Sequence, residues 1–187
     1  MPNLMYCSLI MQGEKSDIDH VKKEIAGIDE ENRIRPIDFN KILPMPPELN
    51  VSHIEEIKTL CRQKYIKQST DKHLEIFLKA EGSESYQSNL LLAEKYYENF
   101  KQFGYMTWYD WCIENWGTKW NAIYDEFQEK NHDPHVIHFV TAYHPPIPVM
   151  NALACKYPKV EFSLEYFDEQ DHDDITTVEF KLVEPKT

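Results

Sequence analysis

The chain has 187 residues, of which 42% are hydrophobic and 28% are charged, a composition that excludes a disordered chain and predicts one globular domain, with or without a large insertion. The absence of any run of about 18 apolar residues predicts that nothing spans a membrane. The formal net charge of −12 argues against a conventional nucleic-acid binder, which needs a basic surface, and indicates either a solvated acidic surface or one that engages a basic groove of a partner.

The first expected elements are a strand and a helix. Residues 4–11, LMYCSLIM, form an apolar run, which predicts a central strand covered on both faces. Ser16 is the expected N-cap of the following helix, and Gly27 is its expected C′ residue. The N-terminal residues lack the basic start and the cleavage site of a signal peptide. We therefore expect a cytoplasmic protein.

The middle of the chain is predicted to be helical. It follows residues 38–49, DFNKILPMPPEL, whose three prolines exclude a regular helix or a central strand and predict a docked, extended segment. Helices are expected from Ser52 onward, over 72–80, over 85–103 and over 108–116. Together they predict a helical insertion or subdomain over residues 50–118.

The stretch WCIENWGTKWNA, residues 111–122, joins this insertion to the strands that follow. Trp111 and Trp108 are three residues apart, so they share one side of a helix. Gly117 is expected to end that helix, and Trp120 to begin the next strand. We expect these rings to be core residues that hold the insertion against the sheet. Replacing Trp111 or Trp120 by Ala would then cost about 3–5 kcal/mol.

The C-terminal third predicts a sheet. Its pattern indicates strands, one helix and an acidic turn. The strands are expected over 120–127, 135–143, 159–167 and 176–184, the helix over 145–157 and the turn over 168–174. Without the insertion, the order begins β-α-β-β-α-β, with one extra edge strand. The sequence therefore predicts a single α+β domain over 1–187, with a ferredoxin-like (split βαβ), mainly antiparallel sheet, helices on one face and a helical insertion after the first βα unit.

Four motifs carry a resemblance to a known family. DFNKILPMPPEL, WCIENWGTKWNA, FVTAYHPPIPVMNALACKYP and FSLEYFDE occur in that order. Together they resemble the YubB-like ferredoxin-like domain family, which is found on plasmids, phages and bacterial genomes. The resemblance covers residues 4 to about 168. It implies the fold and a mobile-element context, and it implies no catalytic residue.

Cysteine and histidine are the residue types that could act here as nucleophiles or metal ligands. Cys7, Cys61, Cys112 and Cys155 are widely spaced among apolar neighbours, which favours reduced core thiols over a zinc site or a nucleophile. A histidine group, which Asp133 or the acidic turn could complete, makes a divalent cation site conceivable. Its members are His132, His135, His138, His144 and His172. However, His135 and His138 would point to opposite faces of a strand. We predict no metal and no cofactor.

Three functional hypotheses remain. The favoured one is a non-enzymatic protein-interaction module of phage or plasmid origin, such as an acidic inhibitor of a host defence or nucleic-acid-handling protein. The alternatives are a small-ligand binder or enzyme with a pocket between sheet and insertion, and a single-stranded nucleic-acid binder that uses aromatic side chains such as Tyr6. The expected partner is a host or phage protein. The candidate binding residues are Trp116, Lys119, Trp120, Asn121, His138, Tyr143 and His144.

Overall fold

The structure is a computed structural model, and it describes residues 3–29, 32–66, 82–124 and 133–180. Two compact units make up the chain. We call Met1–Pro44 with Cys112–Thr187 the ferredoxin-like unit and Met45–Trp111 the helical unit. The boundary falls inside helix α6 (Trp108–Asn115). The helix expected over 72–80 lies outside the described residues. Our interpretation of residues 50–118 as an insertion in a single domain stays a prediction.

The ferredoxin-like unit is built on an antiparallel sheet with the strand order β4-β1-β5-β6. Its strands are β1 (Leu4–Gln12), β4 (Val136–Ala142), β5 (Glu161–Asp168) and β6 (Asp171–Phe180). Ile123 makes an isolated bridge to Val140 on the outer side of β4. Helix α7 (Ile147–Lys156) connects β4 to β5, with β1 between them. This is the split βαβ connection, and the predicted ferredoxin-like α+β fold is confirmed.

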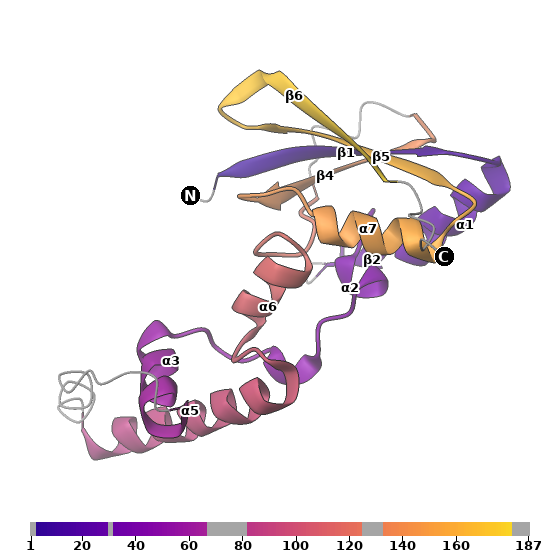
Figure 1. Cartoon of the computed structure of the whole chain (residues 1–187). Helices are drawn as coiled ribbons and strands as arrows, with labels where there is room; N and C mark the ends of the chain where they lie inside the picture. The colour runs from indigo at the N-terminus through magenta and orange to yellow at the C-terminus, as the bar shows by residue number, and fades with distance from the viewer. Residues whose placement is uncertain (1–2, 30–31, 67–81, 125–132, 181–187) are drawn as a thin grey trace, which may run out of the picture. The chain divides into compact units, whose positions relative to one another are not determined.

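The helices of this unit cover one face of the sheet (Figure 1). They are α1 (Lys15–Ile25), the single turn α2 (Phe39–Ile42) and α7. Strand β1 buries Met5, Cys7, Leu9 and Met11 on the helix side, whereas the residues between them are half-buried. The prediction that both faces of β1 are fully covered is therefore wrong. Strand alternation lets one face of an antiparallel sheet pack while the other stays accessible.

Several predicted boundaries differ from the structure. Helix α1 has Glu14 rather than Ser16 as its N-cap. The segment 38–49 contains the turn α2, because the Asp38 carboxylate accepts a hydrogen bond from Asn40 N and the prolines begin only at Pro44. It also contains a 3₁₀ turn, Pro47–Leu49. Two very short strands, β2 (Gly27–Ile28) and β3 (Ile34–Arg35), pair with each other ahead of it.

The predicted acidic turn over 168–174 is also wrong. The turn consists of Glu169 and Gln170, and strand β6 already begins at Asp171. Asp168 closes this turn, because its carboxylate accepts a hydrogen bond from Gln170 N at 2.9 Å. The remaining aspartates are exposed along the strand, so solvent screens their mutual repulsion and a regular strand is possible.

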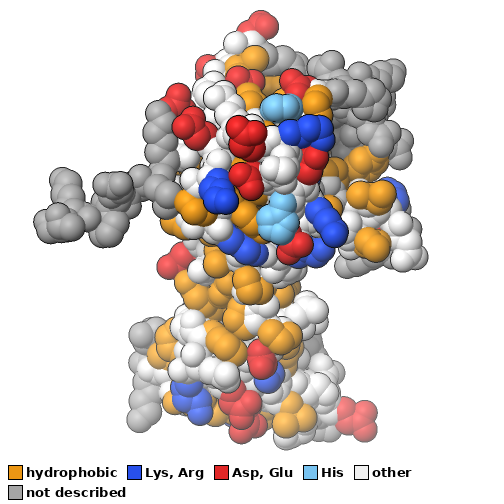
Figure 2. All heavy atoms as spheres, turned by 90° about the vertical axis from the view of Figure 1, so that its right-hand side faces the viewer, with side chains coloured by type: hydrophobic (Ala, Val, Ile, Leu, Met, Phe, Trp, Pro, Cys, Tyr) orange, Lys and Arg blue, Asp and Glu red, His pale blue; other side chains and the backbone are white. Residues whose placement is uncertain are grey.

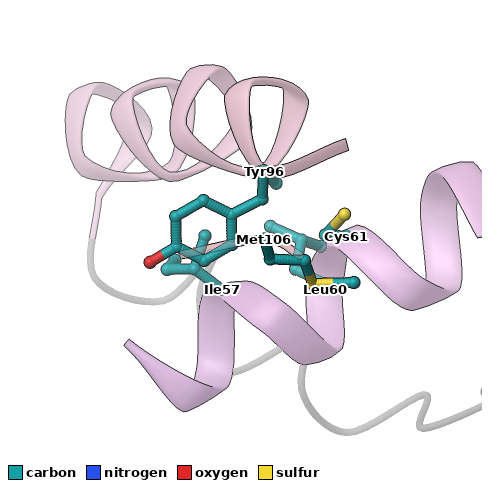
Figure 3. Close-up of a cluster of buried hydrophobic side chains, with 6 residues drawn as sticks. Ile57, Leu60, Cys61, Tyr96 and Met106 are labelled. Atoms are coloured by element: carbon teal, nitrogen blue, oxygen red, sulfur yellow. The ribbon is translucent and has the colours of Figure 1, made fainter. Parts of the chain in front are cut away.

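The helical unit packs α3 (Glu55–Cys61) and the π-helical turn Arg62–Ile66 with α5 (Ser83–Phe103). Helix α3 begins after Ile54 and not at Ser52 as predicted. Ile57, Leu60 and Cys61 of α3 meet Tyr96 of α5 and Met106 in a buried cluster (Figure 3). Gly104 ends α5 with a left-handed φ of 82°, as its type predicts.

Candidate functional site

Two of the seven predicted binding residues hold the fold together. Trp116 is 3% exposed, and its Nε1 donates to the Leu43 carbonyl at 2.8 Å. Its ring meets that of Phe39 edge to face. The Asn121 side chain accepts from Phe39 N at 2.9 Å and donates to the Asp38 carboxylate at 2.7 Å. Both side chains therefore contact the start of α2, and the structure gives them a positioning role within the core.

The conformation of Gly117 lets the chain bring Trp116 and Asn121 against α2. Its φ is 77°, and a Cβ built on it would lie 2.8 Å from Cδ of Pro148 in α7. Only glycine combines a left-handed backbone with so close an approach. The sequence expectation that Gly117 ends helix α6 agrees with α6 ending at Asn115.

The other five predicted residues are spread over three places. Lys119 lies over the Trp120 ring at 4.6 Å, a cation–π pair, and Trp120 is 37% exposed, so the expectation of a buried Trp120 is wrong. His138 lies on the sheet, with Nδ1 at 2.9 Å from Ser8 Oγ. Tyr143 and His144 are exposed in the turn after β4. The seven residues therefore do not form one site within the ferredoxin-like unit.

The open face of the sheet gathers a different set of residues. Tyr6 of β1 faces Phe167 of β5, and their rings are stacked with centroids 5.3 Å apart. On the same face, Ser8 lies between His138 of β4 and Glu165 of β5, because both face it in the register. The register also sets Gln12 opposite Glu161. This open face combines an aromatic pair on the two central strands with carboxylates on β5, and no helix of the unit packs on it (Figure 1).

The charge on the strands has one sign. None of the four strands contains a lysine or an arginine, whereas β5 carries three carboxylates and β6 carries four. They are Glu161, Glu165, Asp168, Asp171, Asp173, Asp174 and Glu179. Elsewhere on this unit the signs are mixed: Figure 2 shows basic and acidic side chains side by side on the side of the unit seen there. The acidic excess of the chain is therefore concentrated on β5 and β6.

A hollow of about 430 Å³ lies at one end of these two strands. It adjoins the irregularity in the β5–β6 pairing between Tyr166 and Asp168. Its lining combines carboxylates with apolar and uncharged polar side chains, namely Asp168, Asp171, Asp174, Met5, Tyr166, Phe167, Gln170 and Thr176. Such a lining suits a cationic side chain with an aliphatic stem, such as lysine or arginine.

The buried thiols are poorly suited to nucleophilic chemistry. Burial raises the pKa of Cys7 to about 12, although a weak hydrogen bond between its thiol and the Thr141 hydroxyl opposes this effect. Burial likewise raises the pKa of Cys112 to about 12 and that of Cys61 to about 11. At neutral pH these groups stay protonated, and a thiol is a weaker nucleophile than a thiolate. Cys155, by contrast, is exposed, so the expectation that all four are core thiols is wrong for it.

The predicted histidine group is dispersed over the described part of the chain. His135 is exposed, and its backbone N–H donates to the Asp133 carboxylate at 2.8 Å. His132 and the side chain of His172 lie outside the described residues. Among the residues that are described, no three His, Cys, Asp or Glu side chains are arranged to hold a metal ion.

Sequence reasoning missed Phe167, Glu161 and Glu165 as members of a shared face. The sequence shows that these three residues alternate with apolar ones along one strand. It does not show their neighbours on β1, because these depend on the pairing register, which places Glu165 beside Ser8 and Phe167 beside Tyr6. Only the Tyr6 position on the first strand gave a signal, since aromatic residues on central strands of this fold are typical of ligand-facing positions.

One family model matches residues 115–184, and its description is a ferredoxin-like domain in Api92-like protein. The matched stretch includes β4, α7, β5 and β6. No curated protein and no solved structure matches the chain. Over the residues that the structure describes, no helix has the length and apolarity to cross a membrane. The family match therefore supports the ferredoxin-like domain on which the acidic strands lie.

Proposed function

We propose that this chain is a non-enzymatic protein-interaction module, and that the open face of its sheet binds a basic surface of another protein. The observation that carries the proposal is the charge of the strands: β5 and β6 hold seven carboxylates, of which Glu161, Glu165 and Glu179 lie on the open face by the register, and no strand of the sheet holds a lysine or an arginine. The negative electrostatic potential of these carboxylates attracts a basic partner and repels an acidic one.

The aromatic pair supplies the apolar part of this surface. Tyr6 and Phe167 are half-buried on the central strands, where rings can be covered by a partner at little cost in side-chain entropy. Carboxylates beside such rings favour lysine and arginine, which can pack their stems on the rings and direct their charge to the acids. The surface therefore has an aromatic centre that a partner can cover, with carboxylates beside it.

The partner class and the origin of the protein follow from the motif resemblance and stay part of the proposal. Motifs such as WGTKWNA and TAYHPPIP are similar to those of a family found on phages and plasmids. An acidic protein of such an element could occupy the basic groove of a host defence or nucleic-acid-handling protein, because its carboxylates would take the place of phosphates.

The test compares two double variants with the same change in charge. Glu161→Gln with Glu165→Gln removes two carboxylates from the open face, and Glu84→Gln with Glu98→Gln removes two exposed ones from α5 of the helical unit. Partners are captured from a bacterial lysate with the wild type and with both variants. We expect a basic protein that the sheet variant no longer retains and the α5 variant still retains. Its affinity, measured after purification, should fall as salt rises. Equal retention by both variants would contradict the proposal.

Single-stranded nucleic acid is the second candidate, because Tyr6 and Phe167 occupy neighbouring central strands, as base-stacking rings do in RNA-binding sheets. The strands offer the phosphates no cation, which weakens this candidate. Fluorescence anisotropy with a labelled single-stranded RNA would decide between the two: binding that a Phe167→Ala variant loses would favour nucleic acid over a basic protein.

A further inference from the structure

Strand β6 forms an edge of the sheet. It is the last strand in the order β4-β1-β5-β6, and among the described residues it pairs with β5 alone. An edge strand presents a row of backbone N–H and C=O groups to which another strand can add. Which residues of β6 carry these groups follows from the hydrogen bonds on the other side of β5.

Glu169 N donates to the Leu4 carbonyl at 2.9 Å, one position beyond Met5 and Asp168, which lie opposite each other in the β1–β5 register. Residues along a strand turn their backbone groups alternately to one side and the other. Phe162, Leu164 and Tyr166 therefore turn theirs toward β6, where they face Phe180, Val178 and Thr176. It follows that Thr177, which lies between two of these positions, directs its N–H and C=O groups away from β5 and out of the sheet.

The side chains along this edge suit strand addition. Residues 175–178 read ITTV, four β-branched residues without charge, and Ile175 is 56% exposed. β-branched residues favour an extended backbone and pack well against a neighbouring strand. Asp173 and Asp174 precede this stretch and Glu179 follows it, so an apolar centre is framed by carboxylates.

These charges decide which kind of strand can be added. If two copies of β6 paired at this edge, six carboxylates would come together, namely Asp173, Asp174 and Glu179 of each copy, and like charges across a ladder are destabilising. A segment with β-branched residues at its centre and lysine or arginine on both sides would instead place opposite charges across the ladder. The edge therefore favours a basic segment of another protein over a second copy.

We propose that the outer edge of β6 binds an extended, basic segment of a partner protein, which adds to the sheet as a further antiparallel or parallel strand. This inference rests on the proposed function for its partner class, and it adds the mode of binding. Backbone hydrogen bonds from Thr177 would supply affinity, and the carboxylates at 173, 174 and 179 would select the charge of the segment.

The test uses Thr177→Pro with Thr177→Val as its control. Proline removes the outward N–H of residue 177 and leaves the ladder to β5 intact, a position at which edge strands accept proline; valine keeps the N–H. The probe is a synthetic peptide of alternating lysine and valine, and a peptide of alternating glutamate and valine measures the role of charge. Binding to the full chain is followed by fluorescence anisotropy at low salt.

We expect Thr177→Pro to bind the lysine peptide about tenfold or more weakly, the equivalent of about 1.4 kcal/mol, while Thr177→Val binds like the wild type. The glutamate peptide should not bind. Equal binding by the proline and valine variants would overturn the inference. If Thr177→Pro does not fold, amide hydrogen exchange of the wild type decides: the Thr177 amide should exchange more slowly with the lysine peptide, and unchanged exchange would overturn the inference.

Two further results separate this inference from the proposed function. If the sheet variant Glu161→Gln with Glu165→Gln loses the captured partner while Thr177→Pro retains it, the open-face function stands and strand addition is wrong. If Thr177→Pro loses the partner while the sheet variant retains it, strand addition stands and the open face is not the binding surface. A dimer of the wild type in sedimentation that Thr177→Pro abolishes would overturn the choice of a basic segment in favour of a second copy.

Discussion

The two units use their charged residues in opposite ways. In the helical unit, Lys58 is 4% exposed, and its ammonium lies 2.9 Å from the Asp110 carboxylate and 3.4 Å from that of Glu55. Arg62 adds a second cation at 3.3 Å from Glu55. On the sheet of the ferredoxin-like unit, the strands carry carboxylates and no lysine or arginine. A carboxylate that holds a buried cation contributes to stability, whereas one without a cation nearby is available to a partner.

The pKa of Glu55 reflects its role in the helical unit. Partial burial raises this pKa, but the nearby Lys58 and Arg62 outweigh burial and leave it below its ordinary value. A lowered folded-state pKa means that the contribution of Glu55 is present above its unfolded pKa and is lost as pH falls through the folded one. The helical unit should therefore lose part of its stability in acid.

The largest expected effect tests whether the ferredoxin-like unit takes its stability from its apolar core. Trp116→Ala removes a buried ring and leaves the Leu43 carbonyl without its donor, so the free energy of unfolding should fall by about 3–5 kcal/mol. Urea denaturation followed by circular dichroism measures it. Trp120→Ala is the control, because that ring is partly exposed, and it should cost less than about 1 kcal/mol. If both variants lost a similar amount of stability, the conclusion that Trp116 belongs to the core and Trp120 does not would be contradicted.

The next effect tests the role of charge in the helical unit. Asp110→Asn leaves the Lys58 ammonium buried with a weaker set of acceptors, so the free energy of unfolding should fall by about 2 kcal/mol, a value at the lower end because Asp110 is partly exposed. Glu56→Gln, an exposed change on α3, the helix that carries Lys58, is the control. Urea denaturation that gives both variants the stability of the wild type would remove the contrast between the units.

An effect that is absent near neutral pH and grows in alkali is expected from the buried thiols, which occur in both units. Their pKa values are raised in the fold, so the unfolded chain loses these protons first and stability falls as pH rises above about 8.5 toward 12. Each thiol should add about 1.4 kcal/mol per pH unit to this slope. Cys112→Ala should reduce the slope of urea-derived stability against pH, and Cys155→Ala, at an exposed position, should leave it unchanged. A slope insensitive to Cys112→Ala would show that other groups control the alkaline limb.

The sequence predicted the four strands of the sheet and the helices α1 and α7, because hydrophobic periodicity follows directly from burial on one face. The further strand predicted over 120–127 is wrong for its described part, where residues 120–124 make only the isolated bridge at Ile123. Predictions failed where a single local contact decides the structure. Asp38 caps a helical turn in a segment expected to be extended, and Asp168 closes a two-residue turn, so that Asp171 begins a strand instead of continuing a loop. The candidate surface depended on register: Tyr6 and Phe167 are 161 positions apart in the chain, and only strand pairing brings them together.

The smallest expected effect sharpens the comparison most directly. Glu165 lies on the open face opposite Ser8 and Thr177, and among the described residues it forms no ion pair. If carboxylates on the sheet serve binding rather than folding, Glu165→Gln should change the free energy of unfolding by less than about 0.5 kcal/mol, with a small gain from reduced repulsion at low salt. Urea denaturation at two salt concentrations measures this change. A loss comparable to that of Asp110→Asn would mean that the sheet, like the helical unit, uses its carboxylates to hold its own fold, and the distinction between the two units would not stand.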